Sequence, residues 1–168
     1  AIFRDLFHYS AFHLAAIADN ARDVDLAIRW GFGWQMGPFE TWQSAGWDQV
    51  AAWVAEDIAA GRALAGVALP AWVAGEAVRA AKGVHGRAGA YAPSEDKFVA
   101  RSTLPVYRRQ LFPETVFGEA AADRGTTIFE TDAVRMWHQG DDVAIVSFKS
   151  KANTIGEDVL DGLLRAID

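Results

Sequence analysis

The stretch Asp23-Val-Asp25-Leu-Ala-Ile-Arg-Trp-Gly31-Phe-Gly33-Trp-Gln-Met36-Gly37-Pro38-Phe39-Glu40 decides how the first half of this chain folds. Asp23 suits the start of a helix that runs to Trp30, and Gly31 suits its end. Gly37-Pro38 is a second start signal, because proline is tolerated in the first turn of a helix. Glu40 then lies where the helix dipole favours a carboxylate. The stretch therefore predicts two short helices joined by a glycine-containing turn.

The glycines of this stretch superficially resemble a phosphate-binding loop. A dinucleotide loop follows a strand, has the spacing GxGxxG and opens a helix. Here Gly31, Gly33 and Gly37 follow a helical segment with the spacing GxGxxxG, and Pro38 comes next. The sequence therefore favours a helix end, a hydrophobic turn and a new helix start.

The same start and stop signals extend to both sides of this stretch. Apolar residues share a helical stripe before it (Phe3, Leu6, Phe7, Leu14 and Ile17) and after it (Val50, Trp53, Val54 and Ile58). Asn20 can end the first helix, Asp48 can cap the fourth, and Pro70 can open the fifth. We expect helices near residues 2–18, 23–30, 38–45, 48–60 and 70–82, and no strand within residues 1–60.

The pattern changes after about residue 84. Gly86, Gly89, Pro93 and Ser94 predict an irregular stretch, and Pro105 and Pro113 favour an irregular connector. From Thr126 on, two runs are rich in strand-forming residues, the first with Ile128, Val134 and Met136 and the second with Val143, Ile145 and Phe148. A turn at Gln139-Gly140-Asp141-Asp142 makes them a β-hairpin. Thr154 can then cap a last helix, with Glu157 completing a capping box.

The predicted fold class is therefore mainly α: a small helical bundle followed by a β-hairpin and a helix. We expect a helical domain at residues 1–92, a connector at 93–125 and an incomplete domain at 126–168. The apolar stripe of the last helix needs cover that a hairpin alone does not supply (Val159, Leu160, Leu163, Leu164 and Ile167). This ending predicts a fragment of a longer protein. A first residue that is Ala1 rather than Met agrees with this prediction, although removal of an initiator Met would give the same start.

Composition narrows the function. The 168 residues carry a net charge of −6, which argues against nucleic acid or an anionic membrane as a partner. Cysteine is absent, so disulfide scaffolds and thiolate metal sites are excluded and a reducing cytosol is compatible. No apolar run reaches the roughly 20 residues that span a bilayer. We expect a cytoplasmic protein without a membrane span.

The histidines and tryptophans offer no catalytic pattern. His8 and His13 do not have the i, i+4 spacing of helical metal ligands, and His85 and His138 stand apart in a loop and a strand. We expect four structural or surface histidines and no metal site. Six tryptophans fall in the helical part, at positions 30, 34, 42, 47, 53 and 72. Core packing is the favoured interpretation of these aromatics, and a ligand groove or subunit interface is the alternative.

The Asp23–Glu40 stretch resembles the C-terminal domain of 3-hydroxyacyl-CoA dehydrogenases, in which an acidic helix start leads to a Gly-Phe-Gly turn and then to Met-Gly-Pro-Phe. Gly89-Ala90-Tyr91 resembles the Gly-Phe-Tyr that closes that domain, so the resemblance covers roughly residues 1 to 92. It implies that the NAD-binding domain and the catalytic His–Glu pair lie upstream of this region. Arg4-Asp5 stands where that family has a substrate-side Asn, which implies a second, structural copy of the helical repeat.

The segment from Val143 to Ile155, followed by an amphipathic helix, resembles the opening of enoyl-CoA hydratases of the crotonase family. That family places an Asn-Ala-Leu-like triplet where Lys151-Ala152-Asn153-Thr154 stands here. The resemblance implies that the oxyanion loop and the catalytic carboxylates come after Asp168. It also implies that Lys151, Ala152 and Asn153 border the CoA moiety of a substrate, with Lys151 near a phosphate.

Taken together, the two resemblances imply a piece of a fatty-acid β-oxidation protein with NAD and acyl-CoA as cofactor and substrate. This chain then holds no catalytic, cofactor-binding or metal-binding residue, turns over neither substrate by itself, and contributes packing and self-association as a dimer. The alternative from a different class is a freestanding helical interaction module with a Trp-lined groove.

Overall fold

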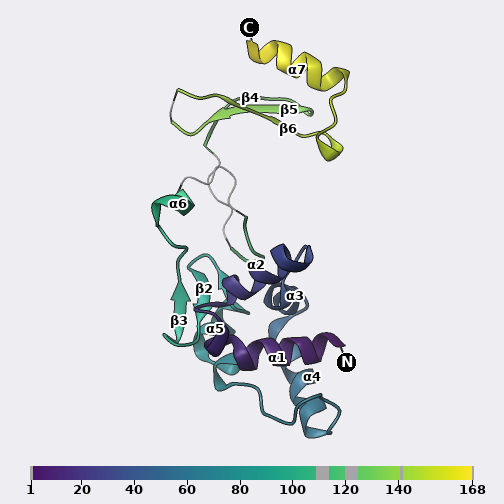
Figure 1. The fold of residues 1–168 in the computed structure, drawn as a ribbon, viewed down its shortest axis with the longest axis vertical. Coiled ribbons are helices and arrows are strands. Elements are labelled where there is room, and N and C mark those ends of the chain that lie inside the picture. The colour runs from purple at the N-terminus through teal and green to yellow at the C-terminus, as the bar shows by residue number, and fades with distance from the viewer. Residues whose placement is uncertain (1, 109–113, 120–124, 141, 168) are drawn as a thin grey trace. The chain divides into compact units, whose positions relative to one another are not determined.

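The computed structural model describes residues 2–108, 114–119, 125–140 and 142–167. The chain divides into two compact units, residues 1–121 and residues 122–168. The first unit is mainly helical, and the second contains a sheet and a helix (Figure 1). The mainly α fold class predicted from the sequence is confirmed. No helix among the described residues is long and apolar enough to cross a membrane.

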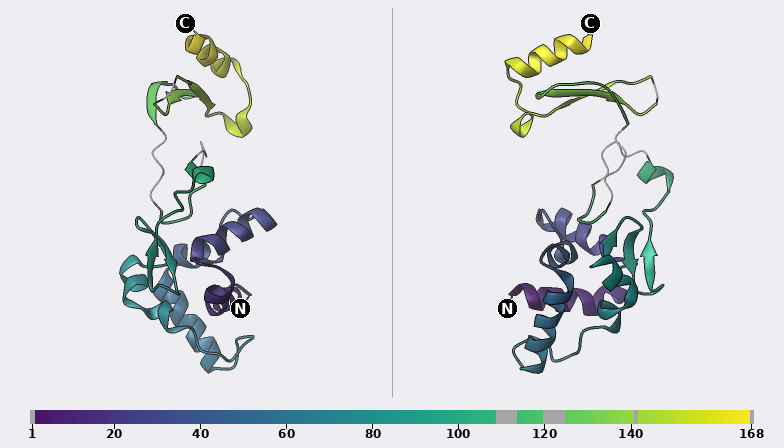
Figure 2. Two further views of the ribbon diagram at one scale, coloured as in Figure 1. Left: turned by 60° about the vertical axis from the view of Figure 1, so that its left-hand side comes forward. Right: turned by 180° about the vertical axis from the view of Figure 1, so that it is seen from behind.

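Four helices form the framework of the first unit: α1 (Ile2–Ile17), α2 (Ala21–Phe32), α3 (Pro38–Ser44) and α4 (Trp47–Ala59). All four lie where the sequence predicts them, and the described part of residues 1–60 contains no strand. α1 contacts α2, α3 and α4, and α2 also contacts α3 (Figures 1 and 2).

The ends of these helices differ from the prediction by a few residues. Asn20 caps the start of α2 with its side chain instead of only ending α1, and it accepts a hydrogen bond from the Asp23 N–H. α2 runs through Gly31 to Phe32, and its C-cap residue, Gly33, adopts the left-handed conformation at φ 68°. α4 begins at Trp47, so Asp48 lies in its first turn and is not its cap.

The helix expected over residues 70–82 is broken in two. A 3-10 helix, η1 (Ala71–Ala74), is followed by α5 (Glu76–Ala81). Gly75 separates them with an extended backbone, φ −63° and ψ 153°. Glycine has a low helix propensity, so it is a natural point for this break.

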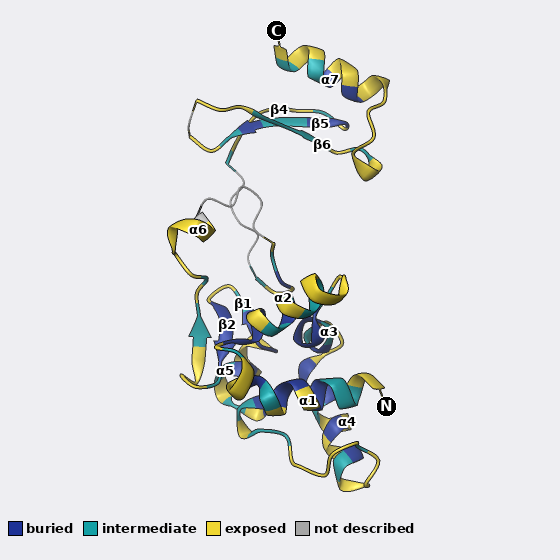
Figure 3. Ribbon diagram, viewed as in Figure 1, coloured by how far each residue is buried: buried dark blue, intermediate teal, exposed yellow. Residues whose placement is uncertain are grey.

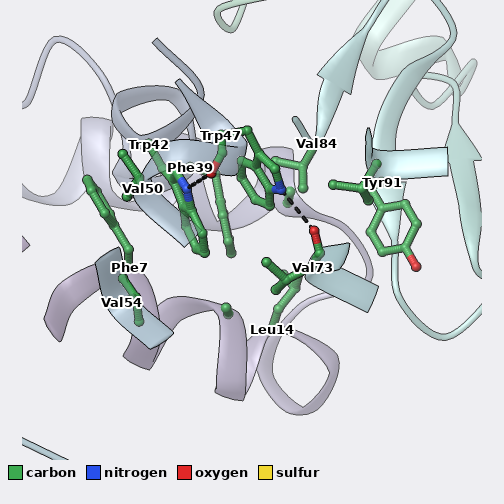
Figure 4. Packing of buried hydrophobic residues seen from close by; sticks show 13 residues of the cluster. Phe7, Leu14, Phe39, Trp42, Trp47, Val50, Val54, Val73, Val84 and Tyr91 are labelled. Atoms are coloured by element: carbon green, nitrogen blue, oxygen red, sulfur yellow. Dashed lines mark hydrogen bonds between the residues drawn. The ribbon is translucent and has the colours of Figure 1, made fainter. Parts of the chain in front are cut away.

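The core of the first unit is a stack of aromatic rings (Figure 4). The rings of Trp42 and Trp47 are parallel within 13° and their centroids are 4.2 Å apart, and Phe7 stacks on Trp42 at 5.5 Å. Each indole N–H is satisfied: Trp42 donates to the Trp47 carbonyl and Trp47 donates to the Val73 carbonyl, both at 3.0 Å. Large aromatic side chains bury much apolar area per residue, which a small unit needs. The core-packing interpretation therefore holds for Trp42 and Trp47.

The stretch predicted to be irregular after residue 84 instead forms a small antiparallel sheet of β1 (His85–Gly86), β2 (Gly89–Ala92) and β3 (Lys97–Val99). β2 is buried at every residue and contacts α2. Gly89 allows this sheet, because its φ is 122° and a Cβ there would overlap the Val99 carbonyl. A short helix, α6 (Pro105–Arg108), follows, and Pro113 lies outside the described residues.

The second unit contains a three-stranded antiparallel sheet in sequence order, β4 (Thr126–Glu130), β5 (Val134–His138) and β6 (Ile145–Phe148). The predicted hairpin is present as β5–β6, with Val134 opposite Phe148. The first strand-forming run predicted from the sequence, with Ile128, Val134 and Met136, consists of two strands, β4 and β5, and a turn at Thr131 separates them. The Thr131 hydroxyl accepts hydrogen bonds from the N–H groups of Ala133 and Val134. Asp141 of the predicted turn lies outside the described residues.

The last helix, α7 (Glu157–Ile167), packs on this sheet through Val159, Gly162 and Leu163. Its start was predicted incorrectly. Thr154 is not its cap, because the Thr154 hydroxyl donates to the Lys151 carbonyl and ends another short 3-10 helix, η2 (Lys151–Asn153). The predicted apolar stripe is half covered: Leu160, Leu164 and Ile167 remain more than half exposed (Figure 3).

Candidate functional site

The spacing between Asp25 and Pro38 has a direct physical explanation in the structure. Asp25 lies on α2, and its carboxylate accepts hydrogen bonds from the first N–H groups of α3, at Phe39 (2.8 Å) and Glu40 (3.2 Å). A helix start carries unsatisfied N–H groups and partial positive charge, so a carboxylate is a suitable partner. Gly37 is needed here because a Cβ would overlap both the backbone and the side chain of Asp25. The motif locks α2 to the start of α3.

Glu40 completes the same helix start. Its carboxylate accepts the Gly37 N–H at 2.8 Å, which matches the favourable position predicted for it, and it also accepts the Phe117 N–H at 2.7 Å. The guanidinium of Arg29 lies 3.4 Å from the Glu40 carboxylate. Glu40 thus links the helix start to a segment that lies far along the chain.

His85 also belongs to this site, although the sequence analysis predicted only a structural or surface histidine in a loop. Its Nε2 lies 2.5 Å from the Asp25 Oδ2, and both side chains are completely buried. Its backbone N–H and carbonyl are both bound by the side-chain amide of Gln43, at 3.0 and 2.9 Å. His85 therefore joins β1 to both α2 and α3. Sixty positions separate His85 from Asp25, so no local spacing could have shown the pairing.

The electrostatics of this pair follow from its burial. Burial raises the pKa of the Asp25 carboxyl, and the hydrogen bonds from His85 and Phe39 act in the opposite direction. His85 Nδ1 is buried and has no hydrogen-bond partner among the described residues. A histidine–carboxylate pair can transfer protons only where a substrate can reach it. Since no part of this pair is exposed, its geometry supports a packing role.

A second charged cluster holds residues 114–119 against the helices. The Glu119 carboxylate accepts hydrogen bonds from Arg22 Nε and from an Arg101 terminal nitrogen, both at 2.6 Å, and the side chains of Glu119 and Arg22 are almost fully buried. Burial raises the pKa of Glu119, but the hydrogen bonds and charges of Arg101 and Arg22 outweigh it and lower the pKa overall. Arg29 adds contacts to the Thr115 carbonyl and the Glu114 carboxylate. Part of the expected connector therefore packs on the helical unit through buried ion pairs.

The glycine-containing turn that leads into α3 does not fit the phosphates of NAD. A dinucleotide needs free N–H groups at a helix start to meet its phosphates. The first N–H groups of α3 are already bound by Asp25 and Glu40, two carboxylates that would repel a phosphate. The sequence argument against a dinucleotide loop thus has a structural counterpart.

Lys151, Ala152 and Asn153, the residues expected to border CoA, form η2 in the second unit and are all exposed. Ala152 and Asn153 both have left-handed backbones, with φ of 55° and 54°. Asparagine tolerates this conformation, whereas alanine adopts it only at an energetic cost. Lys149, two residues earlier, is engaged by the Glu130 carboxylate and the Thr131 carbonyl.

The described residues contain no group of three or more His, Asp or Glu side chains that could hold a metal ion. Trp30, Trp34 and Trp53 are 65%, 41% and 42% exposed. The larger groove of the first unit is lined by aliphatic residues and aspartates, and Trp47 borders a smaller one. The exposed tryptophans therefore line neither depression.

Comparison with known proteins gives one distant relative to consider. The chain is 27% identical over 164 residues to a probable 3-hydroxyacyl-CoA dehydrogenase of Bacillus subtilis (strain 168). The similarity covers 95% of this chain, and therefore reaches into both units, but the chain spans only 18% of that relative's length. No family model matches the chain, and no solved structure gives a significant match. This similarity supports a relation to 3-hydroxyacyl-CoA dehydrogenases.

Proposed function

We propose that this chain is a structural part of an NAD-dependent 3-hydroxyacyl-CoA dehydrogenase that also carries an enoyl-CoA hydratase domain. The observation that carries the proposal is the similarity to a probable 3-hydroxyacyl-CoA dehydrogenase across 95% of the chain. In the reaction, the substrate's C3 hydrogen leaves as hydride to NAD while a base takes the hydroxyl proton, giving the 3-ketoacyl-CoA. The groups for this chemistry belong outside this chain.

The role of this chain in such an enzyme is packing and association. Its buried acid–base groups connect separate elements. The carboxylates of Asp25, Glu40 and Glu119 accept from backbone N–H groups or arginines, and His85 pairs with the Asp25 carboxylate. Buried charged groups of this kind are maintained by their partners and are not free to react. Dimer formation is a further part of the proposal, and the exposed apolar residues of α1 and α7 supply surface for it.

The hydratase part of the proposal places the CoA moiety against Lys151, Ala152 and Asn153. The exposure of all three residues and the left-handed backbone of Ala152 support this position, because strained backbone is concentrated at functional sites. Lys151 would approach a phosphate as a point charge. The site would therefore recognise the nucleotide end of the substrate and not its acyl chain.

The test uses the complete gene product that contains this segment, beside this chain alone. We expect the complete protein to form NADH from 3-hydroxybutyryl-CoA and to hydrate crotonyl-CoA, while this chain alone does neither. A complete protein without dehydrogenase activity would contradict the main proposal. Lys151→Ala in the complete protein should raise the hydratase KM for CoA substrates several-fold, with Lys97→Ala as the control on the first unit. An unchanged KM would show that Lys151 does not contribute to CoA binding.

A second candidate function is a helical protein-interaction module. The observation that favours it is the exposure of Trp30, Phe32 and Trp34 at the end of α2. Exposed aromatic residues are typical of interfaces. A gene that encodes little beyond this chain, and a product that binds a protein partner without either enzymatic activity, would favour this candidate.

A further inference from the structure

A shallow groove lies between the end of α1 and the first turns of α2. It has a volume of about 440 Å³ and is lined by Ile17, Ala18, Asp19, Asp23, Val24, Ala27 and Ile28. None of these residues takes part in the buried ion pairs or in the CoA site proposed above. The groove is therefore a separate feature of the first unit.

The wall that α2 contributes has the spacing of a helix-binding surface. Val24, Ala27 and Ile28 are related as i, i+3 and i+4, so they lie on one face of the helix. Gly31 continues this row one turn later, and no atom lies within 4 Å of the place where its Cβ would stand. Ala27 and Gly31 are small, which leaves room for the ridges of an incoming helix. On the α1 side, Ile17 is 62% exposed at the rim.

One part of the groove is negatively charged, and its two carboxylates form no ion pair within the described part of the chain. Asp19 and Asp23 both border it, and among the described residues neither forms an ion pair with a cation. The Asp23 carboxylate accepts a hydrogen bond from the side-chain amide of Asn20, its local cap partner, at 2.9 Å. The nearest cation in sequence, Arg22, is committed to Glu119 at 2.5 Å. A positively charged group brought by a partner would meet two unpaired carboxylates here.

We propose that this groove binds an amphipathic helix of another protein, with apolar residues at i, i+3, i+4 and i+7 and a lysine or arginine at one end. The apolar residues would cover Ile17, Val24, Ala27 and Ile28, and the cation would lie against Asp19 and Asp23. Helix-in-groove recognition uses this combination of spaced apolar anchors and a charged end. A second copy of the groove is a poor occupant, because it would bring the same aspartates together.

The probe is a fluorescein-labelled helical peptide with leucines at this spacing and two lysines at one end, titrated with the full chain. We expect saturable binding that Ile17→Glu and Ala27→Glu each weaken by about tenfold or more, about 1.4 kcal/mol. Replacing both lysines of the peptide by glutamate should weaken binding to a similar extent. The Asp19→Asn/Asp23→Asn double variant should remove most of the difference between the two peptides.

Ile2→Glu is the matched control, because Ile2 lies on the same helix, is 84% exposed and does not line the groove. It should leave binding unchanged, and circular dichroism should show that all variants keep the fold. Absence of saturable binding, or equal effects of Ile2→Glu and Ile17→Glu, would overturn the proposal. Light scattering provides a further check: a dimer that Ile17→Glu dissociates would identify a second copy as the occupant and overturn it as well. Neither enzymatic activity enters this test, so its result is independent of the proposed dehydrogenase and hydratase activities.

Discussion

His85 Nε2 lies 2.5 Å from Asp25 Oδ2 in a position where neither side chain has any exposed surface. The pair joins a strand to the point where two helices meet, since Asp25 also binds the start of α3. Three elements of the first unit therefore depend on a single carboxylate.

Asp25→Ala should destabilise the first unit by about 3 kcal/mol or more, because it leaves His85 and two helix-start N–H groups buried without a partner. Glu56→Ala is the control, since Glu56 is an exposed acidic residue on α4 and surface substitutions usually change stability by less than about 0.5 kcal/mol. Urea unfolding of both variants measures the difference. Equal midpoints for the two variants would show that the Asp25 contacts contribute little.

Two glycines of the same motif should respond in opposite directions to alanine. Gly37→Ala should lower stability by about 1–3 kcal/mol, because its Cβ would overlap Asp25. Gly31→Ala should raise stability by about 0.5–1 kcal/mol, because Gly31 lies within α2 and open space surrounds its Cβ position. Thermal unfolding gives the sign of each change directly. A neutral Gly37→Ala would mean that α2 and α3 are less tightly packed at this point.

The Glu119 cluster should make stability depend on acid pH. The pKa of Glu119 in the folded protein is lower than its ordinary value of 4.5, so its contribution to stability is complete above that pH. As the pH falls through the lowered pKa, this contribution is lost. Glu119→Gln should therefore be less stable than the wild type at pH 7, and the difference should shrink below about pH 4.

Urea unfolding at a series of pH values tests this expectation. Glu95→Gln is the matched control, because the Glu95 side chain is 51% exposed and its ion-pair partner is the exposed Lys97. Its difference from the wild type should be small at every pH. A Glu119→Gln difference that stays constant from pH 7 to pH 3 would contradict the assignment.

The sequence predicted what is encoded locally. The four helices of the first unit, the glycine turn between α2 and α3 and the β5–β6 hairpin all follow from apolar periodicity and from Gly and Pro positions. The sheet of β1, β2 and β3 was missed because its strands are two to four residues long, too short for a clear alternation of polar and apolar residues. The extra strand β4 was missed because Thr131 makes a turn without a Gly or Pro signal.

The charged clusters could not be predicted in the same way. His85 pairs with Asp25 across sixty positions, and Glu119 pairs with Arg22 across ninety-seven. Pairing at such distances depends on how the elements pack, which no single sequence reveals. One feature of the sequence does point to such pairs. The Asp23–Glu40 stretch contains more acidic residues than are needed to cap its helices, and a buried histidine or arginine needs an acidic partner. The CoA site stays a prediction, because it rests on resemblance and on the local backbone.

The parallel indole rings of Trp42 and Trp47 also provide a spectroscopic probe. Chromophores held 4.2 Å apart in fixed orientation couple their excited states, which should produce a paired positive and negative band in the ultraviolet circular dichroism of the folded protein. Both rings belong to the first unit, whereas Trp137 is the sole tryptophan of residues 122–168. Trp47→Phe should therefore abolish the paired band. In the unmodified protein, loss of that band reports the melting of residues 1–121. A variant in which the other tryptophans are substituted leaves Trp137 as the single emitting tryptophan, and its emission follows residues 122–168.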